Sequence, residues 1–146
     1  MKAKIWLFAA SLAVAGLTGC ASAPEPYCAV DDAAQSEAGQ KCSALLNAFI
    51  ANDDKAFEAQ LPAELQKTFT AAEFKASRLA LADSLGTPKS AAYMDRLKNP
   101  VFVILVYKVD FEKITAENQK IEQQALFRAV YAKVDGRLQL ISFGFI

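Results

Sequence analysis

The sequence predicts an α+β domain in which N-terminal helices pack on a curved antiparallel sheet of three to four strands. Three patterns predict this fold class. Apolar residues first recur at helical spacing, over residues 42–85. The period then drops to two along residues 101–113. Finally, Asp135-Gly136 is a two-residue hairpin signal between two apolar segments, which we therefore expect to pair as antiparallel strands.

The helical part is predicted as a series of short helices. The first begins at Cys42, and its inward face has amphipathic spacing: Cys42, Leu45, Leu46, Phe49 and Ile50. Asn52 and Asp53 interrupt this pattern, and Asp53 or Asp54 can cap a second helix. Pro62 ends that helix and suits the first turn of the next one.

A capping box predicts where the last helix begins. Thr70 and Glu73 have the spacing at which both side chains can accept hydrogen bonds from backbone donors. We expect this helix to run to about residue 85 with Phe74 facing inward, and to stop at Gly86. The following Thr87-Pro88 prevents its continuation.

The C-terminal half is predicted to be all strand. Residues 90–97 form a weak strand candidate, whereas residues 101–113 form a strong one whose inward face is Val101, Val103, Leu105, Tyr107, Val109 and Phe111. The other face starts apolar and becomes polar, in the order Phe102, Ile104, Val106 and Lys108. The apolar half must therefore be covered on both sides, either by the helices or by another chain. Residues 121–134 and 137–146 form the last two strands.

The N-terminal segment MKAKIWLFAASLAVAGLTGC resembles a bacterial lipoprotein signal. Two lysines precede an apolar run, residues 5–17, which is shorter than the about 20 residues that span a bilayer. Leu17-Thr18-Gly19-Cys20 resembles a lipobox. The resemblance implies that residues 1–19 are removed, that Cys20 carries the lipid, and that residues 20–41 tether a domain of residues 42–146. The alternative is an ordinary secretory signal with Cys20 as a spare thiol.

The same resemblance implies a location. Ala21 follows the lipidated position, where an aspartate tends to retain enterobacterial lipoproteins in the inner membrane. Alanine therefore favours the outer membrane, facing the periplasm. In this oxidising compartment the two remaining cysteines, Cys28 and Cys42, are expected to form a disulfide. A loop of about 15 residues would contribute about 3 kcal/mol; the alternative is two reduced thiols.

Composition excludes several classes of function. Once Lys2 and Lys4 have left with the signal, 14 basic side chains remain against 16 acidic ones, and this formal charge of −2 argues against nucleic acid as a partner. The chain has no histidine, which excludes Ser-His-Asp and Cys-His catalysis and histidine-ligated zinc. It also lacks the residue order of an EF-hand calcium loop. We expect no cofactor and no metal.

A second resemblance concerns the domain. The element order, Leu85-Gly86 and the segments VYKVDF and EQQALFRAVYAKVDGRLQLISFGF resemble small bacterial envelope domains of unknown function in the nuclear transport factor 2-like, or cystatin-like, superfamily. This implies a cone-like fold with a pocket between sheet and helix, and favours sheet-to-sheet dimers. Amphipathic or aromatic strand residues are the candidates for a pocket or interface: Tyr93, Phe102, Tyr107, Arg128 and Tyr131. The alternative for each is a sheet-edge position with its polar tip in water.

These features predict a lipid-anchored, non-enzymatic binding or accessory module for a protein partner or a small apolar ligand. Its partners are the membrane, through the lipid, and a second copy or another envelope protein, through the sheet. The alternatives are a structural spacer and a carboxylate-dependent hydrolase acting on peptidoglycan or lipid, for which the available acidic clusters are Asp53, Asp54 and Glu58, and Asp110 and Glu112. The first cluster is typical of a helix start and the second of a solvated strand end.

Overall fold

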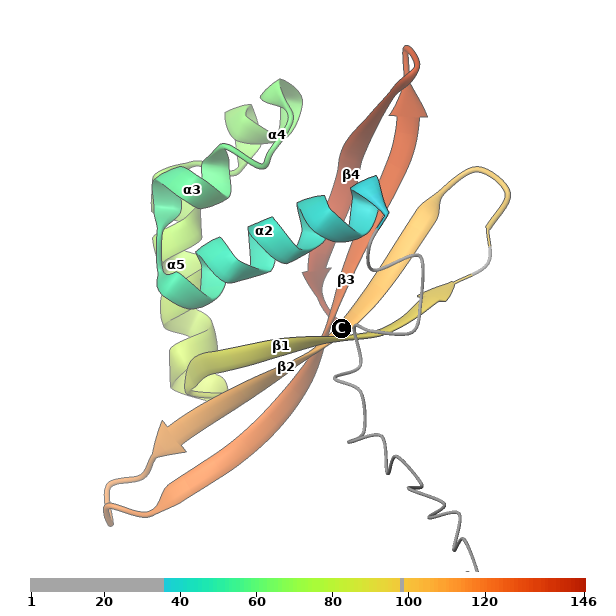
Figure 1. Ribbon diagram of the computed structural model, residues 1–146. Coiled ribbons are helices and arrows are strands. Elements are labelled where there is room, and N and C mark those ends of the chain that lie inside the picture. The colour runs from blue at the N-terminus through green and yellow to red at the C-terminus, as the bar shows by residue number, and fades with distance from the viewer. Residues whose placement is uncertain (1–35, 98) are drawn as a thin grey trace, which may run out of the picture.

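The computed structural model describes residues 36–97 and 99–146. Within them, helices precede strands along the chain (Figure 1): α2 Glu37–Ala51, α3 Asp54–Glu58, α4 Ala63–Thr68, α5 Ala71–Ser84, β1 Thr87–Leu97, β2 Val103–Ile114, β3 Lys120–Val134 and β4 Arg137–Phe145. The strands form one antiparallel sheet in the order β1-β2-β3-β4. The predicted α+β class, with helices followed by an antiparallel sheet, is confirmed.

Helix α2 begins at Glu37, so the predicted start at Cys42 was wrong. The hydroxyl of Ser36 caps the helix by accepting a hydrogen bond from the N–H of Gly39 at 3.2 Å. The apolar period missed this turn because the residues that it buries are small and add little to the pattern. The helix therefore includes the end of residues 20–41, which were predicted as a tether.

Three helix boundaries lie at capping residues that the sequence predicts, whereas α3 ends at Glu58, well before Pro62, and Pro62 precedes α4 as its N-cap. Asn52, in the left-handed conformation with φ 58°, closes α2. The carboxylate of Asp53 accepts a hydrogen bond from the N–H of Ala56 at 2.9 Å and so begins α3. The hydroxyl of Thr70 accepts from the N–H of Glu73 at 3.4 Å at the start of α5. Local side-chain chemistry thus sets these boundaries.

Strand β1 is longer than predicted, because it starts directly after Gly86 rather than at residue 90. Gly86 adopts φ +98°, and its N–H bonds back to the carbonyl groups of Leu81 and Ala82 at the end of α5. Two register shifts relative to β2 then interrupt the alternation of β1. These irregularities explain why a search for a period of two finds only a weak strand here.

Strand β2 starts later than predicted, and Val101 does not lie on its inner face. Val101 precedes the strand and is 68 % exposed. The N–H groups of Val101 and Phe102 both donate to Oδ1 of Asn99 at 2.9 Å, which holds these residues in a turn. The rest of the predicted inner face is confirmed. Val103 is half-buried against the core, and these side chains are buried: Leu105, Tyr107, Val109 and Phe111.

The core lies between the helices and the inner face of the sheet. Helix α2 contacts β1 and β2, while α3 and α5 contact each other. In Figure 1 α2 crosses the sheet, and α3, α4 and α5 lie beside it. No helix of the described ranges is long and apolar enough to cross a membrane.

The outer face of the sheet keeps exposed apolar side chains. Met94 is 49 % exposed, Leu97 48 % and Leu126 37 %, while Ile104 and Val106 are half-buried. The helices of the described chain therefore do not cover both faces.

Candidate binding site

A cavity of about 380 Å³ lies between the helices and the sheet, next to the end of β4. We call it the phenylalanine cavity. Its lining contains one polar side chain, that of Ser77, and is otherwise almost entirely aromatic: Phe49, Phe57, Phe69, Phe74, Ser77, Leu81, Phe127, Phe143, Gly144 and Phe145. A lining of this kind gives an apolar group contacts on several sides and offers a polar group one hydroxyl only.

The rings of the cavity hold one another in place. Phe57 of α3 meets Phe143 of β4 with ring centres 5.6 Å apart at 71°, and Phe69 meets the same ring at 5.2 Å and 79°. On the sheet, Phe127 and Phe145 are 5.3 Å apart at 68°. These are edge-to-face arrangements, which stabilise aromatic pairs beyond simple burial. These ring contacts therefore connect the helical part of the chain to β4 and hold the walls of the cavity in place.

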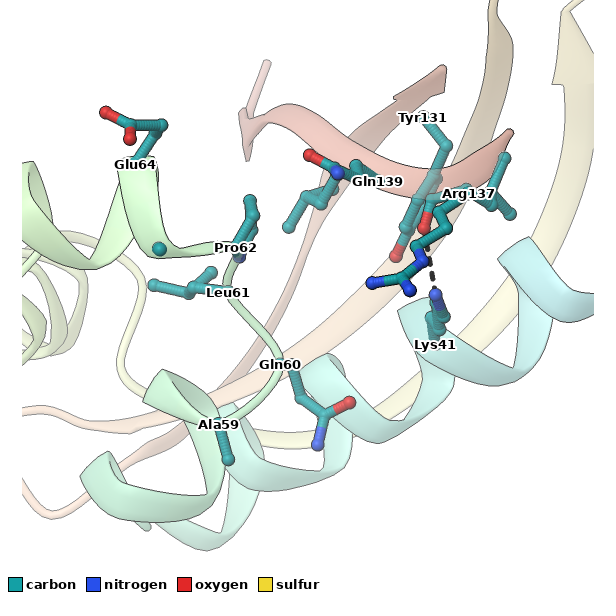
Figure 2. Close-up of a pocket in the computed structure, with 12 residues that line it drawn as sticks. Lys41, Ala59, Gln60, Leu61, Pro62, Glu64, Tyr131, Arg137 and Gln139 are labelled. Atoms are coloured by element: carbon teal, nitrogen blue, oxygen red, sulfur yellow. Dashed lines mark hydrogen bonds between the residues drawn. The ribbon is translucent and has the colours of Figure 1, made fainter. Parts of the chain in front are cut away.

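A second hollow, of about 560 Å³, opens where β4 begins, and we call it the basic cleft. Figure 2 shows Lys41 and Arg137 on one side of it and residues 59–64 on the other. Nζ of Lys41 donates to the carbonyl of Leu138 at 2.9 Å and pairs with Glu37 at 3.0 Å. Arg137 has no ion pair or side-chain hydrogen bond with any residue that the structure describes.

A third hollow, of about 860 Å³, lies over the polar half of the outer sheet face. Asp110 accepts hydrogen bonds there from Ser90 at 2.7 Å and Gln124 at 2.8 Å. Glu112 pairs with Lys120 at 2.8 Å, and the hydrogen bond from Lys120 holds the pKa of this carboxyl below its usual range. A hydrolase of the carboxylate type needs an acid with a raised pKa. The pKa of Glu112 is shifted in the opposite direction.

The other acidic cluster has structural partners. Asp53 caps α3, and Asp54 lies 3.5 Å from Nζ of Lys75. Among the residues described, no group of three histidine, cysteine or acidic side chains is placed to hold a metal ion. In both clusters, acidic side chains thus form hydrogen bonds or ion pairs with neighbouring residues of the described chain.

The three tyrosines predicted for a pocket or interface lie in the core. Tyr93 and Tyr107 meet edge to face with ring centres 5.5 Å apart. The hydroxyl of Tyr107 donates to the carbonyl of Gly39 at 3.4 Å. Tyr131 is 1 % exposed, hydrogen-bonds Cys42 and forms part of the wall of the basic cleft. These tyrosines mainly support α2 on the sheet.

The other two predicted residues lie elsewhere. Phe102 is half-buried in the turn before β2. Arg128 is exposed on the outer face, where it is paired in register with Val106 and Gly144. The structure therefore does not bring the five residues together in one site.

Cys42 is a free thiol and is fully buried. Burial raises the pKa of the thiol to about 12, although hydrogen bonds with Tyr131 and Tyr107 oppose this shift. Its predicted partner Cys28 lies outside the described residues, as does Cys20. The disulfide stays a prediction, and it requires Cys28 to reach a sulfur atom that α2 and the sheet enclose.

The superfamily resemblance implies a pocket between sheet and helix, but it does not identify the residues of the phenylalanine cavity. A signal was present, because the chain has ten phenylalanines and seven of them line this cavity. Periodicity can place such residues on the inner side of a helix or strand. It does not tell whether the converging rings fill the space between the layers or leave part of it open.

No protein-family model matches the chain, and no curated protein matches it. Among solved structures, the chain is similar to a putative calcium/calmodulin dependent protein kinase II association domain from Xanthomonas campestris, with 17 % sequence identity and a TM-score of 0.39. The match covers 75 % of this chain and 86 % of that chain. At this level of similarity the function of that domain does not transfer, and the proposals below depend on the residues of this chain.

Proposed function

We propose that this chain is a bacterial envelope lipoprotein whose domain is a non-enzymatic binding module. Lipid on Cys20 anchors it in the outer membrane, and the phenylalanine cavity binds an apolar group of a small ligand or of a protein partner. The lipobox-like Leu17-Thr18-Gly19-Cys20 and the apolar segment before it support the anchor. The cavity supports the binding role.

The single observation that carries the binding role is the open space among seven phenylalanine rings. Protein interiors are close-packed, and spaces larger than a water molecule are few. The volume of about 380 Å³ falls within the range of small-molecule sites, about 300 to 1,000 Å³. Apolar cavities favour apolar molecules over water, because water inside them lacks hydrogen-bond partners.

The test uses the fluorescent apolar dye N-phenyl-1-naphthylamine as a probe, with the mature chain lacking the lipidated cysteine. Ser77→Phe places a ring inside the cavity, whereas Ser84→Phe makes the same substitution on an exposed position of the same helix. We expect the first variant to weaken dye binding by about tenfold or more, because the added ring takes the space of the ligand. The matched control should bind as the parent does.

Circular dichroism establishes that both variants are folded before their dye affinities are compared. If Ser77→Phe does not fold, Ser77→Leu gives the same comparison with a smaller added volume. Dye binding that is absent from the parent chain, or equal in a folded cavity variant, contradicts the proposed site.

A second candidate role is self-association through the outer face of the sheet. Leu97 is paired in register with Ile104, and Ile104 with Val130, so that apolar side chains lie side by side across three strands. Leu126, which is 37 % exposed, lies on the same face of β3, with Arg128 between it and Val130. A contiguous apolar surface of this kind marks an interaction site, and an identical surface on a second copy would cover it.

Sedimentation equilibrium of the mature chain tests this role. We expect a concentration-dependent dimer that Leu126→Asp weakens by about tenfold or more, since the new carboxylate would be buried against apolar side chains. Leu79→Asp is the control, because Leu79 is also exposed but lies on α5. A strict monomer at all concentrations contradicts this role.

A further inference from the structure

Strand β4 is an edge of the sheet, and one of its sides has no partner strand within the described chain. In an antiparallel pair, successive residues direct their N–H and C=O groups alternately toward and away from the partner. The N–H of Ile146 donates to the carbonyl of Leu126 at 2.9 Å, which fixes this alternation at the end of the strand. The backbone groups of Phe143 and Phe145 therefore point away from β3, toward the open edge.

This edge lacks most of the usual protection against pairing. Natural edge strands are blocked by lysine, by proline, by an inward-pointing charge or by a β-bulge. From residue 138 to residue 145, β4 reads LQLISFGF and contains no lysine, proline or charge, and its one irregularity is the register shift between Leu140 and Ser142. The one charge on the strand is Arg137, its first residue. The edge is thus chemically open along most of its length.

Both the basic cleft and the phenylalanine cavity border this edge. The first residues of β4, residues 137–140, line the basic cleft, and residues 143–145 line the phenylalanine cavity. Figure 1 shows α3 and α4 across from β4, and Phe57 of α3 and Ala63 and Glu64 of α4 line the two cavities. A strand added beside β4 would point every second side chain toward the helices, because strand side chains alternate between faces. Those side chains would meet the two cavities in succession.

We propose that the open edge of β4 binds an extended peptide segment of another protein as an additional strand, with apolar side chains in the phenylalanine cavity and an acidic side chain beside Arg137. The inference deepens the proposed function and rests on it, since it names the partner that supplies the apolar group. Main-chain hydrogen bonds give such complexes their affinity, and side-chain pockets give them specificity.

The charge of Arg137 favours a different protein over a second copy of the chain as the partner of β4. Arg137 has no ionic partner in the described part of the protein, so a carboxylate brought to it gains a new ion pair. Strand β4 itself contains no aspartate or glutamate. Two copies paired through β4 would therefore supply no acidic side chain from that strand, whereas a different protein can.

The test uses the full-length protein in lipid nanodiscs and a displayed library of random peptides of about ten residues, which matches a long strand. We expect the selected peptides to alternate apolar and polar residues and to carry an acidic residue near one end. Each selected peptide is then made in two N-methylated forms, one modified at the odd amides and one at the even amides. Only one set of amides faces β4, so one form should lose binding by about tenfold or more and the other should keep it.

Two charge reversals complete the experiment. Arg137→Glu should weaken the selected peptides, whereas Lys55→Glu makes the same change of charge on an exposed position of α3 and should not. Selection of no peptide, equal effects of the two N-methylated forms, or self-association that excludes the peptides would overturn the proposal. If the parent chain still binds the dye in any of these cases, the proposed apolar site stands although the peptide proposal fails. If the parent chain does not bind the dye either, both proposals are contradicted.

Discussion

The guanidinium of Arg78 lies over the face of the Phe49 ring, with its central carbon 4.9 Å from the ring centre. Nε of Arg78 donates to the side-chain carbonyl of Asn52 at 3.3 Å. Nη1 is buried and has no hydrogen-bond partner in the described part of the chain, and burial lowers the pKa of this side chain. The face of the Phe49 ring therefore replaces much of the water that would otherwise hydrate the guanidinium of Arg78. Since Phe49 lines the phenylalanine cavity, Arg78 supports one of its walls from behind.

We predict that Arg78→Ala lowers the free energy of unfolding by about 2 kcal/mol, because it removes both the cation and the alkyl stem that packs on Phe49. Arg78→Met keeps most of the stem and should cost about 1 kcal/mol or less, since it also removes the buried and unpaired Nη1. Urea unfolding of the two variants measures the difference. Equal stability of Arg78→Ala and the parent would show that the contact with the ring contributes nothing.

Gly86 is the residue at which a side chain should be least tolerated. It has φ +98°, and a Cβ atom there would lie 2.6 Å from the carbonyl carbon of Glu112 and 2.8 Å from Cα of Lys113. We predict that Gly86→Ala costs about 3 kcal/mol, because the turn between α5 and β1 must move away from β2. Gly136→Ala is the control, with φ +75° but no atom within 4 Å of the added methyl group.

The control substitution should cost only about 1 kcal/mol, which is the price of a left-handed alanine without a clash. Urea denaturation midpoints of the two variants give the comparison. If both glycines tolerate alanine equally, the close approach of β2 to Gly86 is not a constraint on the fold.

Local chemistry explains which parts of the fold could be predicted from the sequence. The capping residues Asp53 and Thr70 act on neighbours three residues away, and Asp135-Gly136 forms its turn with φ values of 51° and 75°. Each signal is complete within a few residues. The alternation of Leu105 to Phe111 was equally readable, since one buried face gives a period of two.

The parts that were missed depend on contacts between distant segments. The first turn of α2 is buried through small residues, which no apolar period detects. Val101 leaves the strand because Asn99 bonds its N–H group. The phenylalanine cavity requires that Phe57 and Phe143, far apart in the sequence, meet at 5.6 Å without filling the space beside them. Sequence periodicity contains no information about that distance.

Cys42 should make the stability of the domain depend on pH in alkaline solution. Its pKa rises from 9.0 to about 12 in the folded state, so the folded protein keeps the proton more tightly than the unfolded chain does. The stabilisation is fully present below pH 9 and is lost as the pH rises toward 12. The free energy of unfolding should then fall with a slope that approaches about 1.4 kcal/mol for each pH unit. Burial also raises the pKa of Tyr131, which adds to the same trend.

Urea unfolding between pH 8 and about pH 10.5, under reducing conditions, tests this dependence. Cys42→Ala should flatten the slope, whereas the contribution of Tyr131 remains in both proteins. A variant with the same slope as the parent would show that the thiol does not titrate differently on folding. Mass analysis of the unreduced, unfolded protein addresses the predicted bridge, because a disulfide between Cys28 and Cys42 would leave neither cysteine available for alkylation.

Lipid on Cys20 is the prediction on which the envelope location depends. A single acyl chain gives only reversible membrane binding, with about 0.8 kcal/mol for each buried methylene, whereas two or three chains anchor a protein stably. We predict that mass spectrometry of the full-length protein, produced in a bacterium, finds an N-terminus at Cys20 with a mass increase of at least two acyl chains. Cys20→Ser should abolish both processing and membrane retention, while Cys28→Ser, the control, should leave them intact. Ala21→Asp should move the lipoprotein from outer to inner membrane fractions on a sucrose gradient, and an unmodified N-terminus at any other residue would remove the anchor.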